Sequence, residues 1–283
     1  MRTQSRDTSP QAERVLIDLI RKAPITKRFD MVRSLTASTS RANMQYIQNT
    51  HPRASQAEIA QIFAARPRNQ SLQMLARSLG KRLENRTDWT LHESDVLVVL
   101  RSIADTFEKL QVPYYFSGSV VSSVYGMQQL AQDIDVVIDP EASPHDLMAH
   151  LQKDYHIDEQ AIYQAVQQRT AFSMIHLDTL LKVDVIISRS RPFTEEMRSR
   201  VQWNILDQSH APFPLVSPED IVLVKLEHHG KAERVPDDQW NDILGVLKVQ
   251  GSSLDLAYLE KWASCLDVAD LLNQACLDAG LKE

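Results

Sequence analysis

Two aspartates stand at the head of an apolar stretch in the middle of the chain, where Asp133-Ile134-Asp135 is followed by Val-Val-Ile. Side chains on a β-strand alternate between its two faces, so Asp133 and Asp135 point to the same face. Two carboxylates about 4 Å apart repel each other by roughly 1 to 4 kcal/mol, depending on the effective dielectric. A cation is expected to offset this repulsion, and the pair therefore predicts a metal site.

A third carboxylate, Asp184, is the only acid in the strand-like stretch 181–187. If that strand lies beside the one that carries Asp133 and Asp135, all three carboxylates can converge at one edge of a sheet. Oxygen ligands from so few protein groups suit Mg²⁺ or Mn²⁺, which keep bound waters and take further ligands from substrate phosphates. Asp133, Asp135 and Asp184 are therefore predicted to hold Mg²⁺ or Mn²⁺; a solvated strand acid is the alternative interpretation of Asp184.

A glycine and a serine, Gly118-Ser119, end an earlier apolar run, and thirteen residues separate Ser119 from Asp133. Glycine lets the backbone come close to a phosphate, and Ser119 adds a hydroxyl donor. The N-terminus of a following helix supplies unpaired N–H groups and a partial positive charge. Gly-Ser alone is a common helix start, but together with the aspartate pair it predicts that Gly118 and Ser119 bind the phosphates of a nucleotide.

Charge divides the chain into two unlike parts. Residues 1–90 contain 16 Lys and Arg against 7 Asp and Glu, whereas the remainder contains 15 against 30. A basic region can dock on an acidic one or bind an anion such as nucleic acid, and solvated arginines on helices are the plainer interpretation. Caps and apolar spacing predict helices throughout this basic part. They are expected at residues 9–23, 26–50, 55–66 and 70–83.

Helices and strands alternate in the middle of the chain, and helices return at its end. A polar stretch at 84–92 marks the predicted boundary, so the expected domains are 1–90, 91–215 and 216–283. The fold class predicted is α+β, a sheet flanked by helices, with an all-helical N-terminal domain and a helical C-terminal region packed on the core. Trp203, Trp240 and Trp262 are expected in the core. Strands are expected at 114–117, 134–139, 172–177 and 181–187, and later helices at 93–112, 144–153, 158–168, 218–229, 236–249, 256–265 and 268–278.

Composition narrows the class of protein. The chain is 43% hydrophobic and 24% charged, which is typical of a globular protein with a packed core. Its first thirty residues contain no signal-peptide apolar region, and no stretch approaches the roughly 18 apolar residues of a membrane span. The expected protein is cytoplasmic and does not contact a membrane.

With these residues in place, the chain resembles the nucleotidyltransferase superfamily with the DNA polymerase beta type of fold, in particular its minimal and toxin–antitoxin-associated branch. The matching motifs are Gly118-Ser119, then Asp133-Ile134-Asp135, then Asp184 on a later strand. The stretch 217–226, SPEDIVLVKL, resembles the family helix after the sheet, and 238–243, DQWNDI, resembles a later family helix. Gln129 and Ala131 stand where many relatives carry Arg and Thr, and Arg234 is the match for a family arginine.

The resemblance implies a mixed sheet and an enzyme that moves a nucleoside monophosphate from a nucleoside triphosphate to a hydroxyl. It implies metal binding by Asp133 and Asp135, a ligand or base role for Asp184, and contact of Lys225 with the nucleotide phosphates. The acceptor expected is RNA, including tRNA, or a protein partner met through the basic N-terminal domain. Two alternatives stay open: a catalytically inactive nucleotide-binding or antitoxin protein, and a nucleotidyltransferase acting on a small aminoglycoside-like acceptor.

Overall fold

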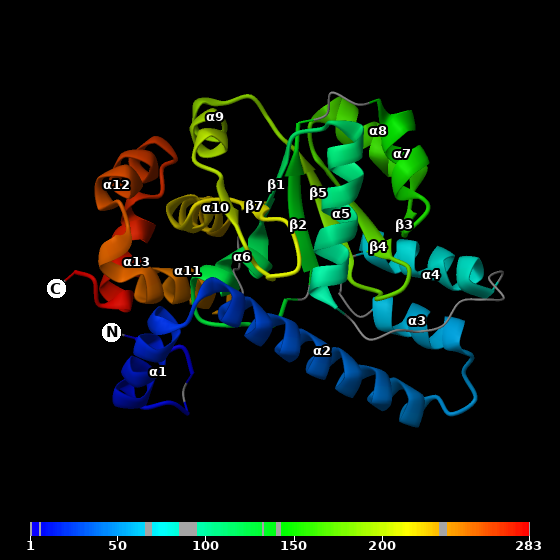
Figure 1. The fold of residues 1–283 in the computed structure, drawn as a ribbon, viewed down its shortest axis with the longest axis horizontal. Helices are drawn as coiled ribbons and strands as arrows, with labels where there is room; N and C mark the ends of the chain where they lie inside the picture. The colour runs from blue at the N-terminus through cyan, green and yellow to red at the C-terminus, as the bar shows by residue number, and fades with distance from the viewer. Residues whose placement is uncertain are drawn as a thin grey trace. The chain divides into compact units, whose positions relative to one another are not determined.

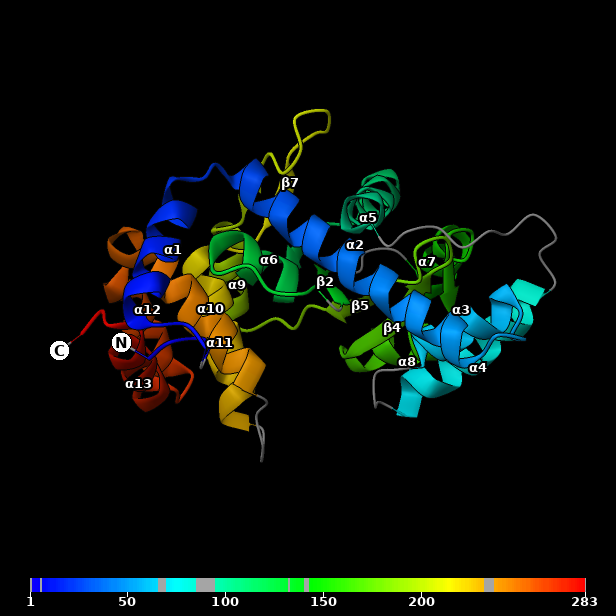
Figure 2. The ribbon, with the colours of Figure 1, turned by 90° about the horizontal axis from the view of Figure 1, so that it is seen from below.

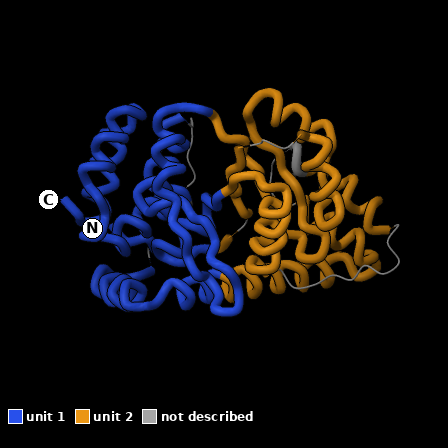
Figure 3. The backbone as a smooth tube through the Cα atoms, turned by 45° about the horizontal axis from the view of Figure 1, so that its top comes forward, with its two compact units in different colours: residues 1–32, 115–129, 190–283 blue, residues 33–114, 130–189 orange. Residues whose placement is uncertain are grey.

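The computed structural model describes residues 2–5, 7–65, 70–84, 95–131, 133–139, 143–231 and 237–282. Its helices and strands are mixed along the chain, which confirms the predicted α+β class (Figure 1). The chain forms two compact units, each built from separated segments (Figure 3). Unit 1 comprises 1–32, 115–129 and 190–283, and unit 2 comprises 33–114 and 130–189. The predicted boundaries at 90 and 215 remain a prediction.

Four strands of unit 2 lie in the order β3-β4-β5-β2. β2 and β5 are parallel, whereas β4 runs antiparallel to both β5 and β3. β2 and β5 are therefore neighbours, as the sequence interpretation of the three aspartates requires. Their buried residues are mainly Val and Ile, which suit a pleated surface covered by helices. The bounds are β2 Asp133–Ile138, β3 Tyr155–Ile157, β4 Ala171–His176 and β5 Lys182–Ile187.

Helices of unit 2 cover this set of strands. α7 contacts both α5 and α8, and α8 contacts β4. α3 and α4 lie side by side (Figure 2) and pack apolar residues such as Ala60 and Leu79 against Ile175 and Leu180 of the β4–β5 region. Two helices of the basic N-terminal part thus share a core with the strands. The bounds are α2 Ile25–Thr50, whose residues from Arg33 belong to unit 2, α3 Gln56–Ala64, α4 Gln70–Glu84, α5 Val96–Leu110, α7 Pro144–Leu151 and α8 Glu159–Gln168.

Unit 1 is centred on α11, which contacts α1, α6, α10 and α13. Its strands lie in the order β1-β7-β6, with β1 parallel to β7 and β6 antiparallel to it. No helix in the described part of the chain is long and apolar enough to cross a membrane. The bounds are α1 Pro10–Lys22, β1 Tyr114–Ser117, α6 Gly118–Tyr125, α9 Pro192–Ser199, β6 Gln202–Asn204, β7 Phe213–Leu215, α10 Pro218–Lys231, α11 Asp237–Gln250, α12 Leu256–Cys265 and α13 Ala269–Ala279.

Local capping explains why most helices begin where the sequence predicts. Ser9 caps α1 with Pro10 at the first helical position, and Ser55 and Glu58 form a complete capping box at α3. Five short elements were not predicted: α9, β3, β6, β7 and the 3-10 helix η1 Gly251–Ser253. Three of them are strands of three residues, too short for a two-residue alternation to be recognised. The residues of the predicted boundary from 85 to 92 lie outside the described part.

The core placement predicted for the tryptophans is correct for two of them. Trp240 and Trp262 are each only 7% exposed, whereas Trp203 is 63% exposed. Trp203 lies on the three-residue strand β6, which was not foreseen. Its neighbours Gln202 and Ile205 are exposed as well, so the prediction for Trp203 is wrong because the segment is a surface strand.

A buried histidine on β3 makes the stability of unit 2 depend on pH. His156 is 7% exposed, and its Nε2 lies 2.7 Å from Ser78 Oγ on α4. Burial, with the positive charge of Arg82 in second place, lowers the pKa of His156 from 6.5 to about 4. Between these two values the unfolded chain binds the extra proton. The contribution of neutral His156 to the free energy of unfolding is therefore complete above about pH 6.5, and it is lost as the pH falls toward 4.

Replacing His156 by Gln is expected to flatten this dependence. Wild-type chain should lose on the order of 1 to 3 kcal/mol more unfolding free energy between pH 7 and 4.5 than His156→Gln does. Urea unfolding at the two pH values measures the difference. His145→Gln, at a ring whose side chain is 82% exposed, is the matched control and should behave as wild type. An equal loss in wild type and His156→Gln would contradict the assignment.

Candidate active site

Four charged side chains form a block on adjacent parallel strands of unit 2. In the register of β2 and β5, Asp133 lies beside Lys182 and Asp135 lies beside Asp184. Residues two apart on a strand share a face, and register partners on neighbouring strands point the same way. The three predicted carboxylates are thus brought together on one face, and the two-by-two arrangement adds a lysine that the sequence interpretation had not assigned. These four residues, three carboxylates and one lysine, are called the carboxylate quartet below.

Lys182 connects the two strands of the quartet. Its Nζ lies 2.6 Å from Asp184 Oδ2 and 3.6 Å from Asp133 Oδ2, and its side chain is 17% exposed. Burial works against the charged ammonium, but the charges of Asp184, Asp133 and Asp135 outweigh it and raise the pKa of Lys182. Lys182 therefore carries its positive charge at neutral pH, among carboxylates that would otherwise repel one another.

The third strand in the row contributes a hydroxyl. Ser173 on β4 is the register partner of Asp184, and its Oγ donates a 2.6 Å hydrogen bond to Asp184 Oδ1. Asp184 Oδ2 meets the ammonium of Lys182. Both carboxylate oxygens of Asp184 thus have donors from the chain, and these contacts fix the orientation of that carboxylate.

The donor chemistry of the quartet fits a hard divalent ion. No group of three or more His, Cys, Asp or Glu side chains among the described residues is arranged to hold a metal by itself. Mg²⁺ does not need such a group, because it takes one or two protein carboxylates and completes its shell with water and substrate phosphates. Asp133 and Asp135 supply that number of carboxylates from one face of β2. An oxygen-only set of this kind suits Mg²⁺ or Mn²⁺ better than Zn²⁺, which prefers nitrogen and sulfur.

Helix α2 holds the residues just before β2. The backbone N–H of Ala131 donates to Oγ1 of Thr36, at 3.3 Å, and Thr36 is only 1% exposed. Arg33, one turn earlier on α2, forms two hydrogen bonds with the carboxylate of Asp95, the N-cap of α5. Ala131 stands where many members of the family that the chain resembles carry Thr, and a threonine hydroxyl from α2 meets its backbone N–H. Nothing in the sequence near Ala131 indicates this contact.

The Gly118-Ser119 pair is located in unit 1, at the turn from β1 into α6. Gly118 is the first residue of α6 and has φ of 71°, a left-handed conformation that side chains other than glycine adopt at a cost. β1 ends at Ser117, so Gly118 and Ser119 form the first turn of the helix, as predicted. That turn supplies backbone N–H groups of the kind that bind phosphate.

Lys225 lies on α10 of unit 1 and has a partner that was not predicted. Its Nζ is 2.7 Å from Oδ2 of Asp242 on α11, and both side chains are largely buried. α6 contacts both α10 and α11, so the elements that carry Gly118, Ser119 and Lys225 belong to one packed group. Gly126, at the end of α6, approaches α11 so closely that a Cβ would lie 2.6 Å from the backbone nitrogen of Val246. The family-like DQWNDI stretch thus supplies the carboxylate that orients Lys225.

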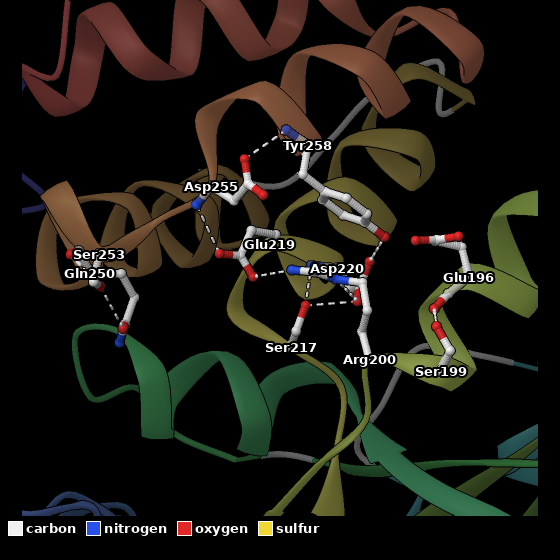
Figure 4. Close-up of polar contacts among 10 residues, drawn as sticks. All are labelled: Glu196, Ser199, Arg200, Ser217, Glu219, Asp220, Gln250, Ser253, Asp255 and Tyr258. Atoms are coloured by element: carbon white, nitrogen blue, oxygen red, sulfur yellow. Dashed lines mark hydrogen bonds and ion pairs between the residues drawn. The ribbon is translucent and has the colours of Figure 1, made fainter.

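The acids at the start of α10 are structural (Figure 4). Asp220 is fully buried and accepts hydrogen bonds from Ser217 Oγ at 2.7 Å and from the Tyr258 hydroxyl at 2.6 Å. Arg200 pairs with Glu219 at 3.0 Å and stacks 3.8 Å above the ring of Tyr258. Burial raises the pKa of Asp220, and the bonds from Tyr258 and Ser217 oppose that rise. Glu219 and Asp220 therefore anchor α10 to α12.

Several arginines of the basic N-terminal part are used inside the fold. Arg21 donates to the carbonyls of Lys248 and Val249 at the end of α11, and Arg82 donates to the carbonyls of Tyr155 and Gln152. Part of the charge that suggested nucleic-acid binding thus stabilises helix ends and loops. The predicted family arginine, Arg234, lies outside the described residues.

No family model matches the chain, and no curated protein matches its sequence. The solved structures that match include two proteins. An antigenic nucleotidyltransferase-like protein from Paracoccidioides brasiliensis is 17% identical, with a TM-score of 0.39, over 63% of this chain and 90% of its own. The antibiotic-resistance factor ANT(2'')-Ia is 14% identical, with a TM-score of 0.41, over 60% of this chain and 94% of its own. Similarity at this level assigns no activity to this chain.

Proposed function

We propose that the protein is a metal-dependent nucleotidyltransferase that moves a nucleoside monophosphate from a nucleoside triphosphate to a hydroxyl acceptor and releases pyrophosphate. The carboxylate quartet carries this proposal, because its strand register places three acids on one face as a phosphoryl-transfer site needs. A structural ion pair network would explain one acid opposite one lysine. It does not explain two further carboxylates on the same face.

In this proposal each residue has a separate task. Asp133 and Asp135 bind Mg²⁺ or Mn²⁺, and a bound ion would stabilise charge on the reacting oxygens of an in-line displacement. Asp184, held by Ser173 and Lys182, faces the acceptor hydroxyl and accepts its proton. Gly118, Ser119 and Lys225 bind the phosphates, and Asp242 keeps the Lys225 ammonium in place. The acceptor proposed is RNA or a protein in a toxin–antitoxin-like setting.

Labelling with the four α-³²P nucleoside triphosphates tests the function. We expect incorporation into at least one of three acceptor classes, total RNA, a protein extract or a set of aminoglycosides, in the presence of Mg²⁺ and not with EDTA. The acceptor class that is labelled also separates the RNA or protein proposal from a small-molecule one. Absence of label with every nucleotide and every class would leave the non-catalytic, nucleotide-binding interpretation.

A further inference from the structure

Phosphoryl-transfer sites often hold two metal ions. We propose that Lys182 occupies the place of a second ion, so that the carboxylate quartet binds a single divalent ion. This inference rests on the proposed function, because it concerns the same acids. Lys182 Nζ lies within the quartet, 2.6 Å from Asp184 Oδ2 and 3.6 Å from Asp133 Oδ2. It bridges the two strands in the way a second metal would bridge two carboxylates.

The charge of the quartet supports one ion. Three carboxylates and one ammonium leave two negative charges, which one divalent ion neutralises. A second ion would place two further positive charges beside the ammonium, and unit charges about 4 Å apart interact strongly in a partly buried site. The Lys182 side chain is 17% exposed and that of Asp184 is 22% exposed, so water screens them only in part.

The contacts of Asp184 support the same conclusion. Its two oxygens accept hydrogen bonds from Ser173 Oγ and Lys182 Nζ, each at 2.6 Å. A metal bound to Asp184 would have to share these oxygens with two donors that are already in place, one of which carries a positive charge. Asp133 and Asp135 share the face of β2 and are the two carboxylates assigned to the metal in the proposed function. The ion is therefore expected at the β2 side of the quartet.

The sequence alternation also shows that the lysine is part of the block. In Lys182-Val183-Asp184 the lysine and the aspartate share a face, and Val183 is fully buried on the other. Lys182 belongs to β5, the same strand as Asp184, and its side chain extends along the sheet face to the acids. Its position is consequently fixed by the sheet register, which distinguishes it from a surface lysine that meets an acid by chance.

Titration of the nucleotide-free 283-residue chain with Mn²⁺ tests the stoichiometry, and the electron paramagnetic resonance signal of unbound Mn²⁺ measures the binding. Wild type is expected to bind one Mn²⁺ per chain. Lys182→Met should bind a second Mn²⁺ or bind the first at least about tenfold more tightly, which corresponds to about 1.4 kcal/mol. Lys182→Arg keeps the charge and should still bind one ion. Lys153→Met, at an exposed lysine of the same unit, is the matched control and should equal wild type.

The outcomes separate the two proposals. Two ions bound by wild type, or unchanged stoichiometry and affinity in a folded Lys182→Met, would overturn the role of Lys182 and leave the proposed function standing. No Mn²⁺ bound by wild type and Lys182→Met, or equal binding after Asp133→Asn with Asp135→Asn, would overturn the metal site and the proposed function with it. If Lys182→Met fails to fold, the wild-type stoichiometry and that of Lys182→Arg still decide.

Discussion

Replacing Asp133 and Asp135 together by asparagine is expected to lower metal-dependent transfer by about a thousandfold or more. The physical reason is the loss of the ion, which stabilises the charge of the transition state by several kcal/mol. Each increase of roughly 1.4 kcal/mol in the activation free energy lowers the rate tenfold. Asparagine keeps the shape of the side chain, so the strand register should persist. The initial rate of label transfer to the acceptor class that wild type labels measures the effect.

The matched control for this pair is Asp105→Asn. Asp105 is an acid of the same unit whose side chain is 61% exposed and pairs with Arg101 one helical turn away. It should leave the rate unchanged, since exposed pairs contribute little. Circular dichroism at several temperatures should show that all variants are folded. Transfer within about tenfold of wild type in a folded Asp133→Asn, Asp135→Asn chain would exclude these acids as the metal ligands of an in-line phosphoryl transfer.

Glu13→Leu is expected to lower the free energy of unfolding by about 3 to 5 kcal/mol, because it leaves a buried ammonium without its carboxylate. Lys248 on α11 lies 3.3 Å from each Glu13 carboxylate oxygen, and the two side chains are 1% and 2% exposed. Burial lowers the pKa of Lys248, and Glu13 opposes that shift. Urea unfolding at pH 7 measures the loss.

A double variant separates the cost of a buried lone charge from the value of the pair. Glu13→Leu combined with Lys248→Met should recover most of the lost free energy, because apolar replacement of a whole buried pair is often neutral. Glu260→Leu breaks an exposed pair with Lys282 and should cost at most about 1 kcal/mol. The interpretation fails if the double variant is as unstable as Glu13→Leu alone.

The positions of the longer helices and strands could be read from the sequence because their signals are local. Caps such as Ser55 with Glu58, and the alternation that begins at Asp133, act within a few residues. The face that a helix buries depends on what packs against it. In the first helix, for example, Val15 and Leu19 are apolar and yet each is 61% exposed. The buried face of that helix consists of Glu13, Ile17 and Ile20.

The same distinction holds for the candidate site. Lys182 could have been assigned from the sequence, since the alternation that pairs Asp133 with Asp135 also pairs Lys182 with Asp184. Ser173 reaches Asp184 only through the pairing of β4 with β5. Thr36 lies 95 residues before its partner Ala131. Contacts of this kind come from tertiary packing, for which a single sequence has no local signal.

The way the chain alternates between its two compact units limits how such a protein can be shortened or recombined. A deletion of residues 1–90 would remove α1, which packs on α11 in unit 1, together with α3 and α4, whose core is in unit 2. Residues 1–90 are therefore not a separate domain that can be removed. Their deletion would disturb folding, and its effect on acceptor recognition could not be measured separately. For the same reason, neither unit could be gained or lost through a single end-to-end gene fusion, and the two are expected to be inherited together.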